Sequence, residues 1–337
     1  MTHASRPRSG ILAFAVKGLV LTACGLALLA ISPDGTSKSS ELRLAPYQPR
    51  SAHHAYGYAL ALEAFRRPGA REWVLSAQRA ISAPERVELP VELTGRFDAG
   101  RTDALGIAFA VRGGRRIYVD VEAEPSAVAP GADGRSPFVE LFAAGDDGFE
   151  PVANPLPLRV RGADPVVQRL EVAALEPGEY VLRVQPEIGF QGRYRVGVRA
   201  APLLAFPVEG VTTRAILSGF GAERDGGARS HRGVDIFAPR GTPALAAMDA
   251  FVSRVETTAR GGNVVWLQPL FGDLRLYYAH LDTQLVRPGD FVLAGEIVGT
   301  VGNTGNAITT PPHLHFGVYV RRRGVRGGAR DPYPFLD

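Results

Sequence analysis

The residues best suited to chemistry are histidines and an aspartate in two short motifs of the C-terminal part. His231 is followed four residues later by Asp235, and His313 is followed two residues later by His315. In an extended strand, side chains at positions i, i+2 and i+4 lie on one face, so both pairs can point into one site. Two imidazoles and one carboxylate suit zinc, and three protein ligands leave the fourth tetrahedral position open to water. The pattern therefore predicts a zinc site.

Three motifs together resemble the signatures of LytM- and lysostaphin-type zinc metallopeptidases. They are His231-x-Gly233-x-Asp235, Tyr278-Ala279-His280-Leu281 and His313-Leu314-His315-Phe316. The resemblance extends from about Phe206 to the C-terminus. It implies an antiparallel-β peptidase domain that cuts the peptide part of bacterial cell-wall peptidoglycan.

The same resemblance implies a role for individual side chains. It makes three of them the metal ligands, namely His231, Asp235 and His315. It makes two more the catalytic pair that orients or deprotonates the metal-bound water, namely His280 and His313.

Two further features bear on the substrate. Residues 302–306 stand where the family has a Gly/Asn loop, and Asn303 and Thr304 are its candidate substrate-binding residues. The chain departs from the family at Gly317, where many members carry an acidic residue. We expect this departure to affect substrate preference more than activity.

The predicted function is a zinc metalloendopeptidase that hydrolyses peptidoglycan cross-links through a metal-activated water. Bound zinc lowers the pKa of water from 15.7 towards ~7 and polarises the scissile carbonyl. An alternative is a non-hydrolytic or conditionally inhibited LytM-type module that binds or activates other cell-wall hydrolases. The intact histidines favour the enzyme, and a zinc peptidase that acts on ordinary proteins would use the same residues.

The N-terminal 32 residues predict export or anchoring. Arg6 and Arg8 precede an apolar stretch, residues 11–32, that is broken by Lys17 alone. About 20 apolar residues can span a bilayer, which favours an uncleaved membrane anchor. Cys24, the single cysteine of the chain, follows Leu-Thr-Ala and makes a lipoprotein the second alternative. A cleaved signal peptide is the third, and all three predict an extracytoplasmic protein in the periplasm or cell envelope.

The chain between the anchor and the peptidase motifs changes its periodicity once. Residues 33–85 predict a linker followed by two short helices, which Pro68 and Gly69 separate. In that segment, His53 and His54 are better explained as a solvated helix start than as metal ligands. Residues 86–200 alternate with period two, as in residues 107–111 and 180–184, and predict an antiparallel β-sandwich accessory domain.

The overall expectation is a mainly β protein whose peptidase domain spans residues 206–337, where no long amphipathic helical pattern appears. The formal net charge of +4 would favour anionic surfaces such as the cell wall, although a solvated arginine-rich surface explains it equally well. Zinc-finger spacing, heptads and aromatic RNA-binding signatures are absent, so we predict no nucleic-acid partner. The expected partners are peptidoglycan, the membrane through the N-terminal tether, and other cell-wall hydrolases or their regulators.

Overall fold

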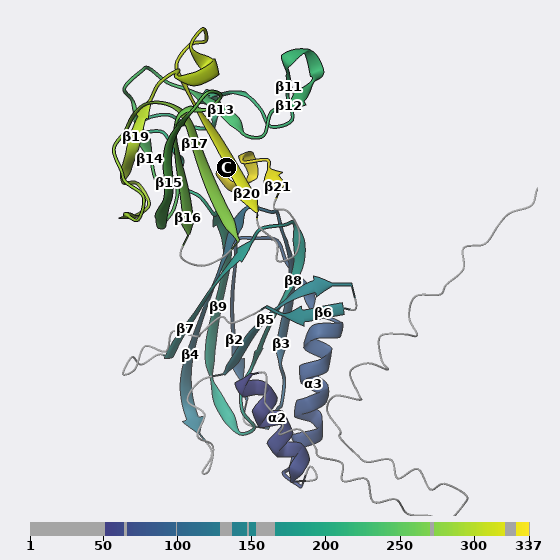
Figure 1. Cartoon of the computed structure of the whole chain (residues 1–337). Helices are drawn as coiled ribbons and strands as arrows, with labels where there is room; N and C mark the ends of the chain where they lie inside the picture. Colours follow the sequence, from purple (N-terminus) through teal and green to yellow (C-terminus); the bar gives the residue numbers. More distant parts are fainter. Residues whose placement is uncertain are drawn as a thin grey trace, which may run out of the picture. The chain divides into compact units, whose positions relative to one another are not determined.

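The computed structural model describes residues 51–63, 66–98, 100–128, 137–146, 148–152, 166–269, 273–320 and 328–336. The predicted anchor, residues 1–32, and Cys24 lie outside these residues. Where the structure describes the chain, we find no helix with the length and apolarity that a bilayer crossing requires. The described part is mainly β, as predicted, with antiparallel sheets and few helices (Figure 1).

The described residues form two compact units. The first contains those that fall within Met1–Ala110, Val119–Leu170 and Glu179–Val198, and the second those that fall within Val111–Tyr118, Glu171–Gly178 and Arg199–Asp337. The predicted domain boundaries differ from these ranges in detail and stay a prediction.

The two short helices predicted on either side of Pro68 and Gly69 are present. They are α2 (Ala52–Leu62) and α3 (Ala70–Ser82). Ser51 caps α2, because its hydroxyl oxygen accepts a hydrogen bond from the His54 backbone N–H at 3.1 Å. The amphipathic pattern of α3 buries Trp73 and Ala77.

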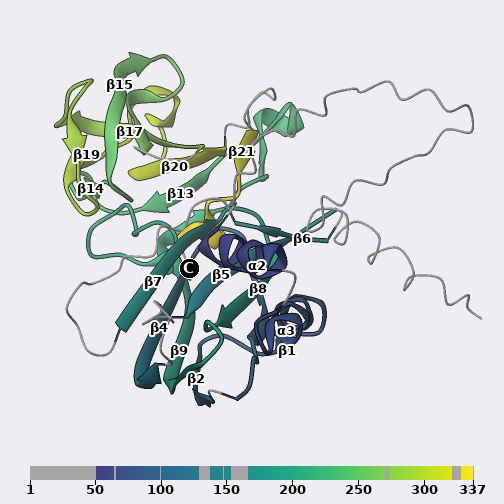
Figure 2. The ribbon, with the colours of Figure 1, turned by 90° about the horizontal axis from the view of Figure 1, so that it is seen from below.

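The strands of the first unit form two sheets. One has the order β1 (Glu85–Arg86), β3 (Leu105–Val111), β8 (Gly178–Gln185), β5 (Phe138–Gly145), β6 (Gly148–Pro151). The other has the order β2 (Val91–Phe97), β9 (Phe190–Pro202), β4 (Arg115–Val128), β7 (Val166–Ala174). Figures 1 and 2 show the helices, the first sheet and the second sheet as successive layers.

The burial pattern follows from this layering. Ile107, Ala108 and Phe109 are consecutive in β3 and all buried, as a strand covered on both faces requires. In β4, Val119 and Val121 are fully buried, whereas Asp120 between them is partly exposed. The period-two pattern at residues 117–121 therefore marks a strand with one covered face, whereas residues 180–184 also alternate in the sequence but lie in a strand that is buried on both faces.

The interpretation of His53 as part of a solvated helix start is wrong. His53 is buried, and its Nδ1 accepts a hydrogen bond from Arg183 Nη2 at 3.0 Å. The ring proton is then on Nε2, which donates to Gln185 Oε1 at 2.7 Å. Arg183 is also paired with Glu140. Burial and the neighbouring Arg183 lower the pKa of His53 to about 4, so the ring is neutral at physiological pH.

The second unit is built around one large antiparallel sheet. Its main path has the order β10 (Ile216–Ser218), β13 (Val234–Phe237), β20 (His313–Val320), β17 (Leu274–Gln284), β16 (Gly262–Pro269), β15 (Ala250–Thr258), β18 (Phe291–Val292). Three further strands join it, namely β14 (Pro243–Leu245), β19 (Ile297–Val301) and β21 (Gly328–Arg330). A separate hairpin joins β11 (Glu223–Arg224) to β12 (Arg229–Ser230), and α4 (Tyr333–Leu336) ends the described chain.

The core of this unit lies on one face of the sheet. Leu276 and Tyr278 of β17 and Leu314 and Phe316 of β20 have almost no exposed surface. The Tyr278 hydroxyl accepts a hydrogen bond from the Ala247 backbone N–H at 2.9 Å, which satisfies the buried phenol. The opposite face of β17 and β20 is left to the polar residues of the site.

Candidate metal centre and active site

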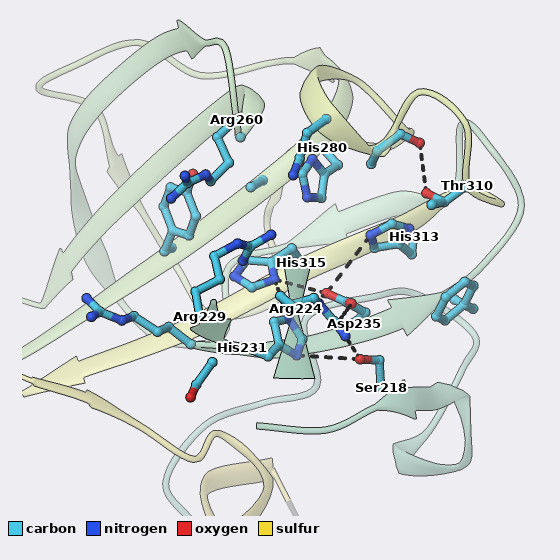
Figure 3. Close-up of a pocket in the computed structure, with 18 of the residues that line it drawn as sticks. Ser218, Arg224, Arg229, His231, Asp235, Arg260, His280, Thr310, His313 and His315 are labelled. Carbon is cyan, nitrogen blue, oxygen red and sulfur yellow. Dashed lines mark hydrogen bonds and ion pairs between the residues drawn. The ribbon is translucent and has the colours of Figure 1, made fainter. Parts of the chain in front are cut away.

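Two of the predicted metal ligands lie opposite each other on adjacent strands. Asp235 of β13 pairs with His315 of β20 in the antiparallel ladder. Asp235 Oδ1 lies 2.9 Å from His315 Nδ1, and His231 Nε2 lies 3.0 Å from the same oxygen. His231 Nε2 and His315 Nδ1 are themselves 2.9 Å apart. The three side chains therefore meet at one point (Figure 3).

His231 does not lie on the same strand as Asp235, contrary to the expectation of one extended segment. Strand β13 begins at Val234, and His231 belongs to the irregular segment before it. Two hydrogen bonds to the segment before β11 fix the backbone of His231. Its N–H donates to the Ala222 carbonyl and its carbonyl accepts from the Gly221 N–H, both at 2.8 Å.

Gly233 makes the approach of His315 feasible. A Cβ at this position would lie 2.8 Å from both Cε1 and Nε2 of the His315 ring and 2.5 Å from the Phe316 carbonyl oxygen. The glycine of the His-x-Gly-x-Asp motif is therefore required by close packing of the backbone against a ligand.

The ring of His231 is oriented by a backbone carbonyl. Its Nδ1–H donates to the Gly219 carbonyl oxygen at 2.8 Å, which leaves the lone pair of Nε2 directed at Asp235 and His315. Histidine ligands of metals commonly donate their second ring N–H in this way.

Asp235 is held on both of its oxygens. Oδ1 faces the two histidines, whereas Oδ2 accepts a hydrogen bond from Arg224 Nη2 at 2.8 Å. Arg224 lies on the β11–β12 hairpin and also donates to Ser218 Oγ at 2.5 Å. Burial opposes ionisation of Asp235, but the adjacent imidazoles of His231 and His315 hold its pKa well below the usual range.

The donor set fits a zinc ion. Zinc bonds of about 2.0–2.2 Å at tetrahedral angles would hold three donor atoms about 3.3 Å apart. The observed separations of 2.9–3.0 Å are close to this value, so small side-chain rotations would accommodate the ion. Two neutral imidazoles and one carboxylate also match the ligand types that zinc prefers.

His280 reaches the site through a β-bulge. Asn263 pairs with Leu281 and Val265 with Tyr278, so β17 carries one extra residue at this point. Among the described residues, His280 is the one non-glycine residue with a positive φ, at 61°. Regular alternation would place His280 on the buried face with Tyr278, and the bulge turns it to the pocket face instead.

The ring of His280 is neutral and oriented. Its Nδ1–H donates to the Thr304 carbonyl oxygen at 2.9 Å, which leaves Nε2 as a proton acceptor. Burial lowers its pKa to about 4, and the hydrogen bond to Thr304 opposes this shift. The ring centroids of His280 and His315 are 5.9 Å apart.

His313 has a matching arrangement on β20. Its Nδ1–H donates to the Pro311 carbonyl oxygen at 2.9 Å, and its Nε2 lies 4.0 Å from Asp235 Oδ1. The ring stacks on Phe237, with centroids 5.0 Å apart. His280 and His313 thus both anchor Nδ1 to the backbone, and their ring centroids are 5.1 Å apart.

All five predicted side chains line one pocket of about 830 Å³. The other lining residues include four arginines, namely Arg224, Arg229, Arg232 and Arg260, and three aromatic residues beside His315, namely Trp266, Tyr277 and Tyr319. Sequence reasoning missed these seven residues. Tyr319 had a detectable signal, because it follows His313 and His315 at period two on the same strand face.

Asn303 and Thr304 brace the neighbouring loop. The Asn303 side-chain amide donates to the carbonyls of Ile308 and Thr310, each at 3.3 Å. Thr304 Oγ1 accepts from the Asn263 N–H at 3.0 Å and donates to the Leu281 carbonyl at 2.8 Å. The loop residues on the described pocket wall are Asn306, Ala307 and Thr310. Substrate contact by Asn303 and Thr304 stays a prediction.

The C-terminal domain is a peptidase domain of the LytM type, because residues 229–329 match the model of Peptidase family M23. The glycyl-glycine endopeptidase ALE-1 of Staphylococcus capitis is 41% identical over 108 residues, which are 32% of this chain and 29% of that protein. The L-Ala–D-Glu endopeptidase of Bacillus subtilis is 33% identical over 140 residues, which are 39% of this chain and 42% of that protein. The chain thus spans less than half the length of these curated relatives.

Among solved structures, the chain is similar to the catalytic domain of the antimicrobial peptidase lysostaphin from Staphylococcus simulans. The match has 37% sequence identity and a TM-score of 0.31, and it covers 35% of this chain and 88% of that one.

Proposed function

We propose that the C-terminal domain is a zinc metalloendopeptidase that hydrolyses the peptide cross-links of bacterial peptidoglycan. The observation that carries the proposal is the convergence of three donor atoms within 3.0 Å of one another, beside two histidines whose Nδ1 atoms are anchored to carbonyls. Three ligands with an open fourth position are typical of catalytic zinc sites.

The relatives support the substrate class. ALE-1 is described as a glycyl-glycine endopeptidase, and the Bacillus subtilis relative as an L-Ala–D-Glu endopeptidase. Both names describe cleavage within short peptides of the kind that peptidoglycan contains. The match of residues 229–329 to Peptidase family M23 supports peptide-bond hydrolysis independently of these names.

The ligands that would hold zinc are His231 Nε2, Asp235 Oδ1 and His315 Nδ1. When bound there, zinc supplies a Lewis acid that activates water and polarises the scissile carbonyl. Asp235 supplies the negative charge of the ligand set, and Arg224 keeps its second oxygen turned away from the ligand histidines.

His280 and His313 move the protons in this mechanism. Either ring can accept the water proton at Nε2, because its Nδ1–H is already committed to a backbone carbonyl. The same proton must then reach the nitrogen of the leaving amine as the C–N bond breaks. A ring that has accepted the proton can donate it there, and a protonated ring also stabilises the oxyanion.

An extracytoplasmic location follows from the substrate, since cross-linked peptidoglycan lies outside the cytoplasm. The N-terminal tether, the accessory role of the sandwich and any regulatory partner stay predictions. The Escherichia coli lipoprotein YgeR, 38% identical over 113 residues, supports attachment to the envelope.

The test is the metal dependence of peptidoglycan hydrolysis by the purified full-length chain. We expect hydrolysis to stop when a chelator removes the metal and to return when one equivalent of zinc is added. A zinc-loaded chain that cleaves no peptidoglycan but stimulates a second hydrolase would replace this proposal with the activator alternative.

A further inference from the structure

One wall of the pocket extends beyond the reacting residues along the face of β20. Every second residue of β20 lies on this face, namely His313, His315, Gly317 and Tyr319. A Cβ at Gly317 would lie 3.0 Å from Tyr319 Cε2, 3.4 Å from Tyr277 Cβ and 3.4 Å from the Arg232 carbonyl oxygen. Because residue 317 is glycine, no side chain of its own covers the floor between the two tyrosines and Arg232.

Three aromatic side chains form the surface beside this floor. The Trp266 ring centroid is 4.4 Å from that of Tyr277 and 5.4 Å from that of Tyr319. The Tyr277 ring lies 5.8 Å from the ring of the ligand His315. All three rings line the pocket and are half-buried, so they can pack against a peptide that extends away from the metal centre.

The charged side chains that line the pocket beside this aromatic surface are mostly positive. Asp235 is the one carboxylate that lines the described pocket, and Arg224 is paired with it. Arg232 and Arg260 line the same pocket and are exposed. Burial raises the pKa of both Tyr319 and Tyr277, and the nearby cations Arg232 and Arg260 oppose this shift at Tyr319 and Tyr277 respectively. Glu256 of β15 acts on Tyr277 in the opposite direction to Arg260. Figure 3 shows Arg260 at the rim of the pocket, on the side of His280.

We propose that this part of the pocket binds a substrate peptide that carries a free carboxylate beside the scissile bond, with Arg232 and Arg260 as the specificity-determining residues. The proposal rests on the proposed function and narrows its substrate class to carboxylate-bearing stem peptides. Guanidinium–carboxylate hydrogen bonds are charge-assisted and frequently bidentate, which gives them both strength and orientation. A glycine chain offers no carboxylate side group and would leave the arginines without this contact.

The experiment compares two synthetic cross-linked peptides that differ in one group. In one peptide the side carboxylate next to the scissile bond is free, and in the other it is a carboxamide of nearly the same shape. We expect the zinc-loaded full-length chain to cleave the carboxylate peptide with about tenfold higher kcat/KM or more, mainly through a lower KM. Raising the salt concentration should reduce this preference, because exposed charges are screened.

The arginine variants assign the preference to residues. Arg260→Gln and Arg232→Gln should each bring the ratio of the two kcat/KM values closer to one, and Arg260→Lys should retain part of it. Arg254→Gln is the control, since Arg254 is exposed on β15 and pairs with Glu256 outside the pocket lining. That variant should keep the wild-type ratio.

The outcomes separate the two proposals. Cleavage of both peptides with equal kcat/KM would overturn the carboxylate preference and leave the peptidase activity in place. An unchanged ratio in Arg260→Gln and Arg232→Gln would overturn the assignment to these two residues. Failure of the zinc-loaded chain to cleave either peptide, and peptidoglycan as well, would overturn the proposed function itself.

Discussion

Asp235 and His315 face each other across the β13–β20 ladder, with Asp235 Oδ1 2.9 Å from His315 Nδ1. This cross-strand pair fixes two of the three proposed ligands on a ladder without a register shift. The third, His231, comes from an irregular segment whose backbone is hydrogen-bonded to Gly221 and Ala222. The site therefore combines a rigid pair with one ligand whose position depends on loop packing.

Removal of Asp235 should empty the metal site. In Asp235→Ala two neutral imidazoles remain, and they neutralise none of the charge of a dication. We expect the variant to retain little zinc after dialysis, as measured by metal analysis against wild type. Asp273→Ala, at an exposed position before β17, is the matched control and should stay fully loaded. Full zinc occupancy in Asp235→Ala would show that the carboxylate is not a ligand.

Gly233→Ala should damage the site without removing a ligand. Its Cβ would clash with the His315 ring and the Phe316 carbonyl, so the ring must move. We expect zinc affinity to fall at least about tenfold, measured by competition with a chelator. At Gly219 a Cβ would meet no atom within 4 Å, so Gly219→Ala should bind zinc like wild type. Equal affinity in both variants would contradict the packing role of Gly233.

Loss of Arg224 should leave the Asp235 carboxylate less well oriented and should lower the affinity for zinc. The Arg224 guanidinium fixes Oδ2 of Asp235, and loss of such outer contacts typically lowers metal affinity 10–100-fold. We expect Arg224→Met to lose affinity in this range and Arg224→Lys to lose less. Tighter zinc binding in Arg224→Met would mean that repulsion between the arginine and the metal outweighs its orienting effect.

His280 and His313 should separate catalysis from metal binding. Neither belongs to the group of three donors, and loss of one acid–base group typically costs 10²–10⁴-fold in rate. His280→Ala and His313→Ala should therefore stay folded and zinc-loaded while their kcat falls by about this factor. Near wild-type turnover would remove that residue from the mechanism. Loss of zinc from His313→Ala would mean that the roles of His313 and His315 are exchanged.

The first unit should lose stability on mild acidification because of His53. Its pKa is about 4 in the folded state and 6.5 as the ordinary value, so below pH 6.5 the unfolded chain binds a proton that the folded chain does not. Stability should be full above pH 6.5 and should fall towards pH 4, by roughly 3 kcal/mol in total from this residue. Urea unfolding at several pH values measures the effect.

The adjacent histidine provides the control for this pH dependence. His54→Gln leaves the buried ring in place and should retain the slope between pH 6.5 and 4, whereas His53→Gln should flatten it. Equal slopes in His53→Gln and wild type would contradict the neutral buried state of His53.

Much of the fold could be predicted because local patterns record one-sided burial. The alternation around Val119 and Val121 marks a strand with one covered face, and Pro68-Gly69 marks the break between two helices. Residue types and spacing predicted that the 231/235 and 313/315 pairs share one site, and the resemblance to LytM-type peptidases implied that His231, Asp235 and His315 are the donors that meet there. These features depend on residues close in sequence or on motifs that occur together in the LytM-type family.

The features that sequence missed depend on distant partners. The bulge at His280 follows from the extra residue of β17 against β16, and no alternation pattern reveals it. His53 is buried because Arg183 and Gln185, more than a hundred residues away, complete its hydrogen bonds. The contact of Arg224 with Asp235 depends on the fold of a hairpin, and the sequence carries no signal for it.

Mass identification of the products released from peptidoglycan tests the central claim most directly. Zinc-loaded wild-type chain should release peptide fragments with new amino and carboxyl ends, and the Asp235→Ala chain should release none under the same conditions. Absence of new peptide ends with the zinc-loaded wild type, or equal release by Asp235→Ala, would contradict hydrolysis at the His231–Asp235–His315 centre.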